Sequence, residues 1–269
     1  MSGKFAGTNY RGSDPLCYRL RMKPWEHPVP PVLYKYFPPQ RLHVLSDFRV
    51  RFSQRTAFKD DHELQPDYSA FGTAQEIERH IQRKNGPNLI PGISSDVLAQ
   101  LIAENPRHQQ TALLTAVRNI KSINEMGILC LTETASSEQM WIEYADNGSG
   151  FVAAFDTTHI GFRKLTTPLG MGRVSYSDNE FATFLGMMEN NVFEPLYRKR
   201  MAYSFEQEWR SIRLLKGLEH HAGDIFLSPF DPASVCEIII RPECGVEERL
   251  REILGKNEQY QHVEIVYQR

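Results

Sequence analysis

Short runs with the composition of buried strands recur along this chain, and one long block of helical pattern separates them into two groups. The runs are VLYKYF at 32–37, FRVRFS at 48–53, GILCLTE at 127–133, FVAAFD at 151–156, SVCEIII at 234–240 and HVEIVYQ at 262–268. Short runs rich in Val, Ile, Phe and Tyr predict strands. The block at about 73–125 has apolar residues three and four apart, which predicts helices interrupted at KNGPNLIPG. This order predicts an α+β fold with a mixed, mostly antiparallel sheet and a helical insertion.

Several elements between these runs are also predicted. The run at 48–53 alternates, with Phe48, Val50 and Phe52 on one face, and is expected to be a half-buried strand. RLHVLSD at 41–47 predicts a helical turn and VEERLREILG at 246–255 a helix. SSEQMWIEYA predicts a short helix capped by Ser136 or Ser137. A long helix is expected at about 179–203, with a break or kink at residue 195, which is a proline.

The N-terminal segment differs from the rest of the chain. Residues 1–31 are rich in Gly, Pro and charge and end in KPWEHPVPP, whose prolines cannot donate to a helix or a sheet. We expect an arm, which either packs across the domain through Tyr18 and Trp25 or is a disordered tail. Residues 32–269 are expected to form a single α+β domain that includes the helical insertion.

Composition limits the class of protein. A chain of 269 residues with 41% hydrophobic content can bury a sizeable core, and 31 Lys and Arg against 33 Asp and Glu leave no bulk basicity for coating nucleic acid. The four cysteines are spaced too irregularly for a disulfide framework or a metal knuckle. No apolar leader is evident, and no run approaches about 18 apolar residues. A cytoplasmic protein without a membrane partner is therefore expected.

Two glutamates stand out in YSFEQEWRSIRLL at 203–215, which is predicted to be a strand. Period two would place Glu206, Glu208 and Arg210 on one face, with the carboxylates roughly 6.5–7 Å apart along the strand. Such a pair can hold a sugar hydroxyl with one carboxylate and orient or deprotonate a nucleophile with the other. The alternative is the solvated face of an edge strand.

The polar face of the strand at 48–53 offers Arg49, Arg51 and Ser53, with Arg55 following. Arginine forks match phosphate oxygens, so this face is expected to hold a pyrophosphate, while Ser53 braces a ribose or a catalytic carboxylate. A solvated face is again the alternative. The basic run YRKR at 197–200, with arginines beyond it, is a local candidate for nucleic-acid contact.

Other signals are weaker. The acidic run DDHE at 60–63 favours a turn or a helix cap over a metal site, because consecutive side chains diverge, and the same argument discounts His220 and His221. Met140, Trp141 and Tyr144 are expected to pack in the core or to line a cleft. No P-loop, dinucleotide fingerprint, HExxH or GxSxG motif occurs.

Four segments, in order, make the chain resemble an uncharacterised bacterial family, domain of unknown function 2971. That family shares an LYKY strand, an FS segment leading to an FNDPFE-type loop, a WxxY helix followed by a GF strand, and a YEKEWR strand. The matching residues are LYKY at 33–36, FS at 52–53 with FKDDHE at 58–63, Trp141 and Tyr144 with GF at 150–151, and FEQEWR at 205–210. The loop differs from the family pattern at Lys59 and Asp61.

More distantly, the chain resembles ADP-ribosyltransferases with an ExE motif. Those enzymes have a basic residue or histidine on a first strand, a serine on a later strand and a glutamate pair near the end. The matching positions here are Lys35 or Arg41, then Ser53, then Glu206 and Glu208. The resemblance implies an ADP-ribosyltransferase-like fold, NAD as co-substrate and no metal.

This resemblance also implies roles. Glu208 would bind the ribose 2′-hydroxyl of NAD, Glu206 would position or deprotonate the acceptor and Ser53 would hold the glutamate. NAD is expected to contact Tyr34, Lys35, Tyr36, Arg41 and Arg51.

The implied function is an NAD-dependent ADP-ribosyltransferase that modifies nucleic acid or protein, as a toxin or phage-defence effector with an antitoxin or inhibitor protein as a further partner. The alternatives are a non-catalytic nucleotide- or nucleic-acid-binding module, and a Mg²⁺-dependent nuclease that uses the acidic run at 60–63.

Overall fold

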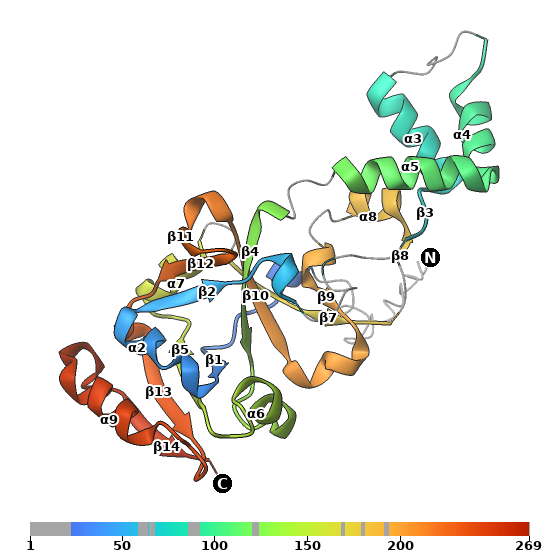
Figure 1. The fold of residues 1–269 in the computed structure, drawn as a ribbon. Helices are drawn as coiled ribbons and strands as arrows, with labels where there is room; N and C mark the ends of the chain where they lie inside the picture. Colours follow the sequence, from blue (N-terminus) through green and yellow to red (C-terminus); the bar gives the residue numbers. More distant parts are fainter. Residues whose placement is uncertain are drawn as a thin grey trace, which may run out of the picture.

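A seven-stranded sheet forms the centre of the computed structural model (Figure 1). The structure describes residues 23–58, 64, 68–85, 92–119, 124–167, 170–178, 181–190 and 194–268. The strand order is β14-β13-β5-β1-β4-β10-β6, and within this sheet only β13 and β14, which lie in the described part of the chain, pair in parallel. The predicted α+β class with a mixed, mostly antiparallel sheet is therefore confirmed.

Most central strands occupy the predicted apolar runs. They are β1 (Val32–Phe37), β4 (Met126–Thr132), β5 (Phe151–Asp156), β13 (Val235–Ile240) and β14 (Glu264–Tyr267), and they are joined by β10 (Glu208–Leu214) and β6 (Met171–Arg173). Strand β5 pairs with β1 and β13, and it is buried on both faces because a hydrophobic cluster packs on each face of the sheet.

Strand periodicity divides the core between the two faces of the sheet. Phe151, Ala153, Ile238 and Ile240 belong to the main hydrophobic cluster, which helices α2 (His43–Asp47), α7 (Ile160–Thr166) and α9 (Glu247–Lys256) complete. Val152 and Ile239, one residue out of step, pack on the opposite face with Tyr36 and Trp141. Helix α6 (Glu138–Tyr144) covers that face and is capped by Ser137, which is one of the two predicted caps.

A three-stranded sheet, in the order β11 (Glu219–Ala222), β12 (Ile225–Pro229) and β2 (Arg49–Phe52), adjoins the main sheet. A bridge between Ser53 and Ile128 connects the two sheets. Val50 and Phe52 are buried as predicted, but Phe48 is not part of the strand. Phe48 ends α2 in the left-handed conformation and packs instead against Phe230 and Tyr260.

The predicted helices of the insertion are α3 (Ala74–Asn85), α4 (Ser95–Glu104) and α5 (Pro106–Asn119). They extend away from the main sheet together with α8 (Phe184–Asn190) and the parallel strand pair β3 (Tyr68–Ala70) and β8 (Phe181–Thr183) (Figure 1). These elements, called the helical lobe below, bury their own cluster of Ile77, Ile81, Phe184 and Leu185 with further neighbours.

Two sequence predictions were wrong around residues 179–208. No long helix spans the described residues of 179–203; this stretch contains β8, α8, β9 (Arg198–Lys199) and two 3-10 turns, η5 (Glu194–Tyr197) and η6 (Met201–Glu206). Pro195 has no amide proton for a helix, and α8 turns its apolar face to α3 instead of continuing. The predicted strand at 203–215 begins only at Glu208, so Glu206 lies in a turn.

The remaining short elements connect these parts. They are β7 (Ser175–Tyr176), which pairs with β9, and the 3-10 turns η1 (Pro24–Glu26), η2 (Pro39–Arg41), η3 (Arg55–Ala57), η7 (Leu215–Gly217), η8 (Pro232–Ser234) and η9 (Glu258–Tyr260). Trp25 of the predicted arm meets the ring of Tyr197 edge-on, with the centroids 6.2 Å apart, while Tyr18 lies outside the described residues. In the described part of the chain, every helix is too short or too polar to cross a membrane.

Candidate functional site

A cavity of about 410 Å³ opens where β1, β4, α6, η6 and β10 meet. Six of the predicted site residues line this cavity, namely Tyr34, Lys35, Tyr36, Ser53, Glu206 and Glu208. Residues more than 150 positions apart in sequence thus meet at one place. Arg41 and Arg51 are not part of its lining.

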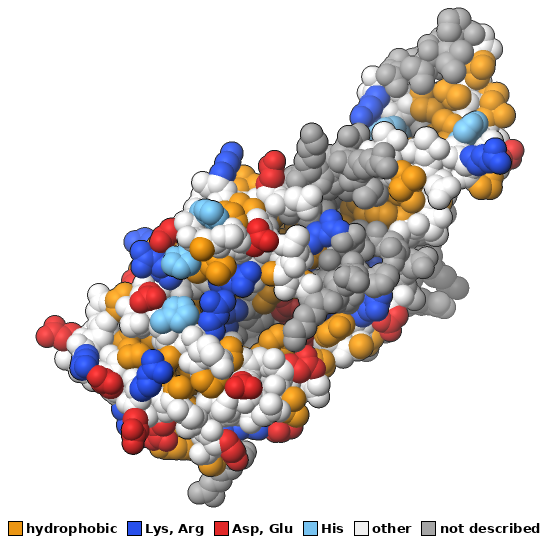
Figure 2. Space-filling model, in the orientation of Figure 1, with side chains coloured by type: hydrophobic (Ala, Val, Ile, Leu, Met, Phe, Trp, Pro, Cys, Tyr) orange, Lys and Arg blue, Asp and Glu red, His pale blue; other side chains and the backbone are white. Residues whose placement is uncertain are grey.

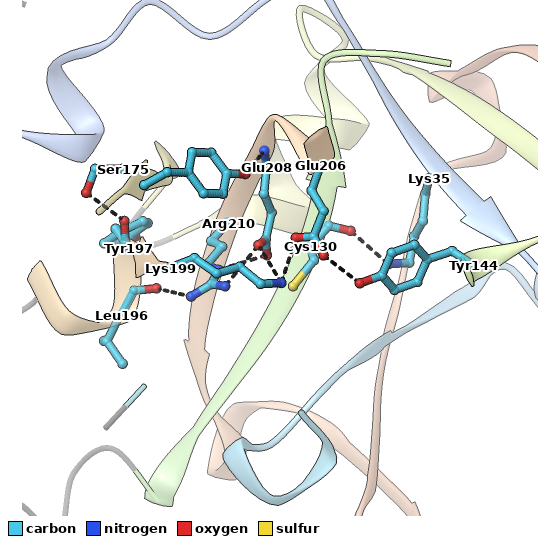
Figure 3. Close-up of polar contacts among 11 residues, drawn as sticks. Lys35, Cys130, Tyr144, Ser175, Leu196, Tyr197, Lys199, Glu206, Glu208 and Arg210 are labelled. Carbon is cyan, nitrogen blue, oxygen red and sulfur yellow. Dashed lines mark hydrogen bonds and ion pairs between the residues drawn. The ribbon is translucent and has the colours of Figure 1, made fainter. Parts of the chain in front are cut away.

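Glu206 and Glu208 reach the cavity by a route other than a shared strand face. Between them, Gln207 adopts the left-handed conformation, with φ 43° and ψ 51°, and ends η6. Lys199 Nζ then lies 2.6 Å from Glu206 Oε2 and 3.7 Å from Glu208 Oε2 (Figure 3). Both glutamates and Lys199 are buried, with at most 8% of each residue exposed, so this cation lies where two carboxylates would otherwise repel each other.

Glu208 is held as a carboxylate. Arg210, two residues along β10 and therefore on the same face, donates from Nε at 2.8 Å and from Nη2 at 2.9 Å to the two oxygens of Glu208 (Figure 3). Arg210 is fully buried and also donates to the carbonyl of Leu196. Burial opposes ionisation of Glu208, but Arg210 and then Lys199 outweigh it and lower the pKa of Glu208 to about 2.

Glu206 has the opposite electrostatic environment. Burial, followed by repulsion from Glu208, raises the pKa of Glu206 to about 7, although Lys199 acts in the other direction. The hydroxyl of Tyr144 donates to Glu206 Oε1 at 2.6 Å and orients this carboxyl group toward the cavity. One site therefore holds two glutamates, of which one stays ionised and the other gains or loses a proton near neutral pH.

Lys35 and Cys130 form the part of the cavity wall next to Glu208. Lys35 donates from Nζ to the carbonyl of Cys130 at 2.8 Å (Figure 3), and burial lowers the pKa of this lysine. Burial and the nearby Glu208 raise the pKa of the Cys130 thiol. The thiol is therefore neutral at physiological pH, and the cations and carboxylates supply the charge of the site.

Arg41 and Arg51 form a pair of like charges close to this wall. The pKa of Arg41 is lowered by burial and by Arg51, and Arg41 in turn contributes to lowering the pKa of Lys35. Arg51 donates to the carbonyl of Asp224 at 3.4 Å, and its Nε is buried without a partner in the described structure. This Nε is a donor that a phosphate oxygen could accept from.

Several other basic residues of the sequence analysis are engaged with partners inside the protein. In the run at 197–200, Lys199 binds Glu206 and Arg198 donates to the hydroxyl of Ser177. Arg213 donates to Ser228, and Arg210 binds Glu208. Lys199 of this run therefore supplies charge that organises the glutamates, while Arg200 is exposed at the surface.

Sequence reasoning missed the two cations that hold the glutamates, Lys199 and Arg210, as site residues. The sequence signal for Lys199 was basic character close to the glutamate pair, and that for Arg210 was its position two residues beyond Glu208 on a predicted strand. Tyr144 was expected in the core or along a cleft, and it lines the cavity, whereas Trp141 is fully buried against Tyr36.

No group of three His, Cys, Asp or Glu residues that could bind a metal occurs in the part of the chain that the structure describes. The acidic run at 60–63 lies outside those residues. His220 and His221 are exposed on β11.

No protein-family model, no curated protein and no solved structure matches the chain. Both family resemblances therefore remain predictions.

Proposed function

We propose that this protein is an NAD-dependent ADP-ribosyltransferase that modifies a macromolecule, with the cavity around Glu206 and Glu208 as its active site. The observation that carries this proposal is the electrostatic difference between two carboxylates in one cavity. Glu208 has a pKa of about 2 and Glu206 a pKa of about 7, and Lys199 contacts both. A permanently ionised group and a group that titrates near neutral pH suit a stabiliser and a general base.

Each glutamate has a role in this reaction. As the bond between the ribose C1′ and nicotinamide breaks, the charge of Glu208 would stabilise the oxocarbenium-like sugar, and a free lone pair would accept the 2′-hydroxyl. Glu206 would take the proton of the acceptor as the acceptor bonds to C1′. Nicotinamide leaves as a neutral molecule, and the proton on Glu206 is released afterwards.

The surroundings of the cavity fit a dinucleotide. Tyr34, Tyr36, Tyr203 and Phe58 supply aromatic surface for a ring to pack on. Lys35 lies in the wall, and the like-charged pair of Arg41 and Arg51 lies close to it, so a pyrophosphate would relieve their repulsion. Ser53 lines the cavity and would act there on the ligand, because Lys199, Arg210 and Tyr144 already hold the carboxylates.

One observation favours a second candidate, a non-catalytic nucleotide-binding module. Arg210 binds both oxygens of Glu208, and Lys199 binds Glu206, as expected for glutamates that only neutralise buried cations. In that case, Arg41 and Arg51 would still bind a nucleotide phosphate.

The test compares transfer of radiolabel from NAD into a cell lysate by the unmodified protein and by Glu208→Gln. We expect the label with the unmodified protein, and a loss of at least roughly 100-fold in the variant, since it removes the charge that stabilises the transition state. Nuclease and protease treatment of the labelled lysate then identifies the acceptor class.

Two controls make this test specific. Glu219→Gln removes an exposed carboxylate, 47% of whose side chain is accessible, and should transfer label normally. Glu206→Gln should still release nicotinamide to water while losing transfer to the acceptor. The binding module would be favoured if NAD bound to the unmodified protein and to Glu208→Gln with equal affinity and neither protein released nicotinamide.

A role as a toxin or phage-defence effector is tested in bacterial cells. Expression should arrest growth or block phage replication, and Glu208→Gln should abolish both effects. An antitoxin or inhibitor protein would be found by its binding to the unmodified protein and by restored growth when both are expressed.

A further inference from the structure

The helical lobe contains a second and larger cavity, of about 830 Å³, far from the glutamate site in the fold. Helices α3, α5 and α8 line it. Its volume lies within the range of small-molecule sites, which are mostly apolar with a few placed polar groups. None of the chemistry proposed above uses this cavity.

Helix α5 contributes a row of mostly small side chains to the cavity. His108, Thr111, Ala112, Thr115 and Ala116 line it, at helical spacings of three and four residues. From the first to the last of these residues the helix rises about 12 Å, so the cavity is long enough for an extended alkyl chain.

Larger apolar residues complete the floor from the other elements. Phe184, Leu185 and Met188 of α8, Phe71 and Ile102 face the same space. The rings of Phe71 and Phe184 stack with their centroids 6.0 Å apart and form a continuous aromatic surface at this end. Met188 is 41% exposed at the opening.

The rim of the cavity carries cations on one side. His80, Arg83 and Lys84 project from α3 at spacings of three and four residues, and His108 of α5 is also part of the lining. Figure 2 shows apolar side chains gathered on this lobe, with Lys, Arg and His side chains at their margin.

The acidic residue in the lining does not neutralise this rim. Glu189 accepts from Arg79 Nη2 at 2.9 Å and lies 3.4 Å from Arg83 Nη1, so two arginines share one carboxylate. Burial, and then Lys84 and Arg83, lower the pKa of His80, while Glu189 acts in the other direction, so His80 lies close to both cations of this rim. An added anion would reduce this repulsion.

From this combination we infer that the helical lobe binds a small amphipathic anion, with its apolar body along α5 and its anionic head at Arg83 and Lys84. The apolar floor accounts for the body, and the excess of positive charge at one rim accounts for the sign of the head. A fatty carboxylate and an anionic lipid share this chemistry.

The test uses dodecanoate below its micellar concentration, titrated into the full-length protein by calorimetry. Dodecyltrimethylammonium, which has the same chain and the opposite charge, should bind roughly tenfold more weakly or not at all, since the rim attracts one head and repels the other. Equal binding of both compounds would overturn the inference, and so would the absence of dodecanoate binding.

Two variants locate the site, each with a matched control. Ala112→Leu fills the hollow and should weaken dodecanoate binding at least roughly tenfold, whereas Gln110→Leu adds the same side chain to an exposed position of α5 outside the lining. Lys84→Glu should weaken binding roughly fivefold, and Lys216→Glu makes the same charge change on an exposed residue of η7. Both cavity variants binding as tightly as their controls would overturn the inference.

A vesicle arm separates the two sources of the ligand. The protein is sedimented with phosphatidylcholine vesicles that contain phosphatidylglycerol. Sedimentation of the protein that Lys84→Glu reduces and Lys216→Glu does not would identify a bilayer lipid as the ligand. Dodecanoate binding without sedimentation would identify a free amphipathic anion.

Discussion

At the scale of single residues, the glutamate pair depends on the backbone conformation of Gln207. A strand through residues 206–208 would keep both carboxylates on one face, roughly 6.5–7 Å apart along the strand. The left-handed turn at Gln207 instead lets both glutamates approach Lys199, at 2.6 and 3.7 Å. A left-handed residue other than glycine at a candidate site is strain that the surrounding structure maintains.

Changing Gln207 tests this dependence. Gln207→Gly removes the steric cost of the left-handed conformation and should leave stability unchanged or slightly raised. Gln207→Val, which is β-branched, should lower the free energy of unfolding by at least about 1–2 kcal/mol. Urea denaturation of both variants measures this difference, and equal stabilities would show that the turn does not constrain the site.

Protonation of Glu206 should make stability depend on pH in a specific window. The pKa of Glu206 is about 7 in the folded protein against an ordinary value of 4.5, so the folded state binds this proton more tightly. The free energy of unfolding should therefore fall as the pH rises from about 4.5 to about 7, by on the order of 1 kcal/mol per unit of pKa difference.

Glu208 acts in the opposite sense. Its pKa of about 2 in the folded protein lies below the ordinary value of 4.5. Ionised Glu208 therefore stabilises the folded state above pH 4.5, and this stabilisation is lost as the pH falls toward 2. Denaturant unfolding from pH 4.5 to 8 should show a decline that Glu206→Gln, which has no titrating proton, reduces. The same decline in this variant would assign it to other groups, such as histidines.

At the scale of elements, β1, β4, β5, β13 and β14 could be predicted because each is a short apolar run in which local preference and burial agree. Helices α3, α4, α5, α6 and α9 followed from their spacing and caps. The prediction for residues 179–208 was wrong because the apolar residues of this stretch pack against different partners. Those of α8 belong to the helical lobe, whereas Leu196 and Tyr197 belong to a cluster beside β4 and β10.

The cap of α6 provides a test at this scale. Ser137 Oγ accepts from the amide of Met140 at 3.4 Å, whereas Ser136 is bonded to Thr134. Ser137→Ala should lower the free energy of unfolding by roughly 1 kcal/mol, because it leaves an amide at the helix start without an acceptor. Ser136→Ala is the neighbouring control and should cost less; a larger loss in this control would assign the cap to Ser136.

At the scale of the whole molecule, the clusters on the main sheet and the separate cluster of the helical lobe support different sites. The main sheet and its helices bury Leu33, Phe52, Trp209 and their neighbours, while the helical lobe buries Ile77 and Phe184. The glutamate cavity lies against the main sheet, and the cavity of the proposed amphipathic anion lies within the lobe. Each site therefore depends chiefly on the packing of its own core.

Separate cores predict separable unfolding. Ile77, which is 1% exposed, packs in the lobe cluster, and Ile77→Ala should destabilise the lobe by about 2–5 kcal/mol. Hydrogen exchange should then accelerate in α3, α4 and α5 and remain slow in β1, β4 and β5. Leu33→Ala in the main core should accelerate exchange in the sheet, and uniform acceleration in both variants would indicate a single cooperative unit.

The sequence by itself determined the class of fold, most strands and the helical block, because these depend on composition and period within short segments. Of the six predicted residues that line one cavity, Ser53 and the two glutamates stood out as polar residues of predicted strands, whereas Tyr34, Lys35 and Tyr36 were implied by the resemblance to ADP-ribosyltransferases. Only the tertiary structure decided how the two glutamates meet and which cations hold them. Arg210 was expected on the same strand face as Glu208, whereas Lys199 lay in a predicted helix, and only the fold brings its ammonium group to Glu206. Charges deep in a protein require partners, and those partners come from chain segments that no local pattern relates.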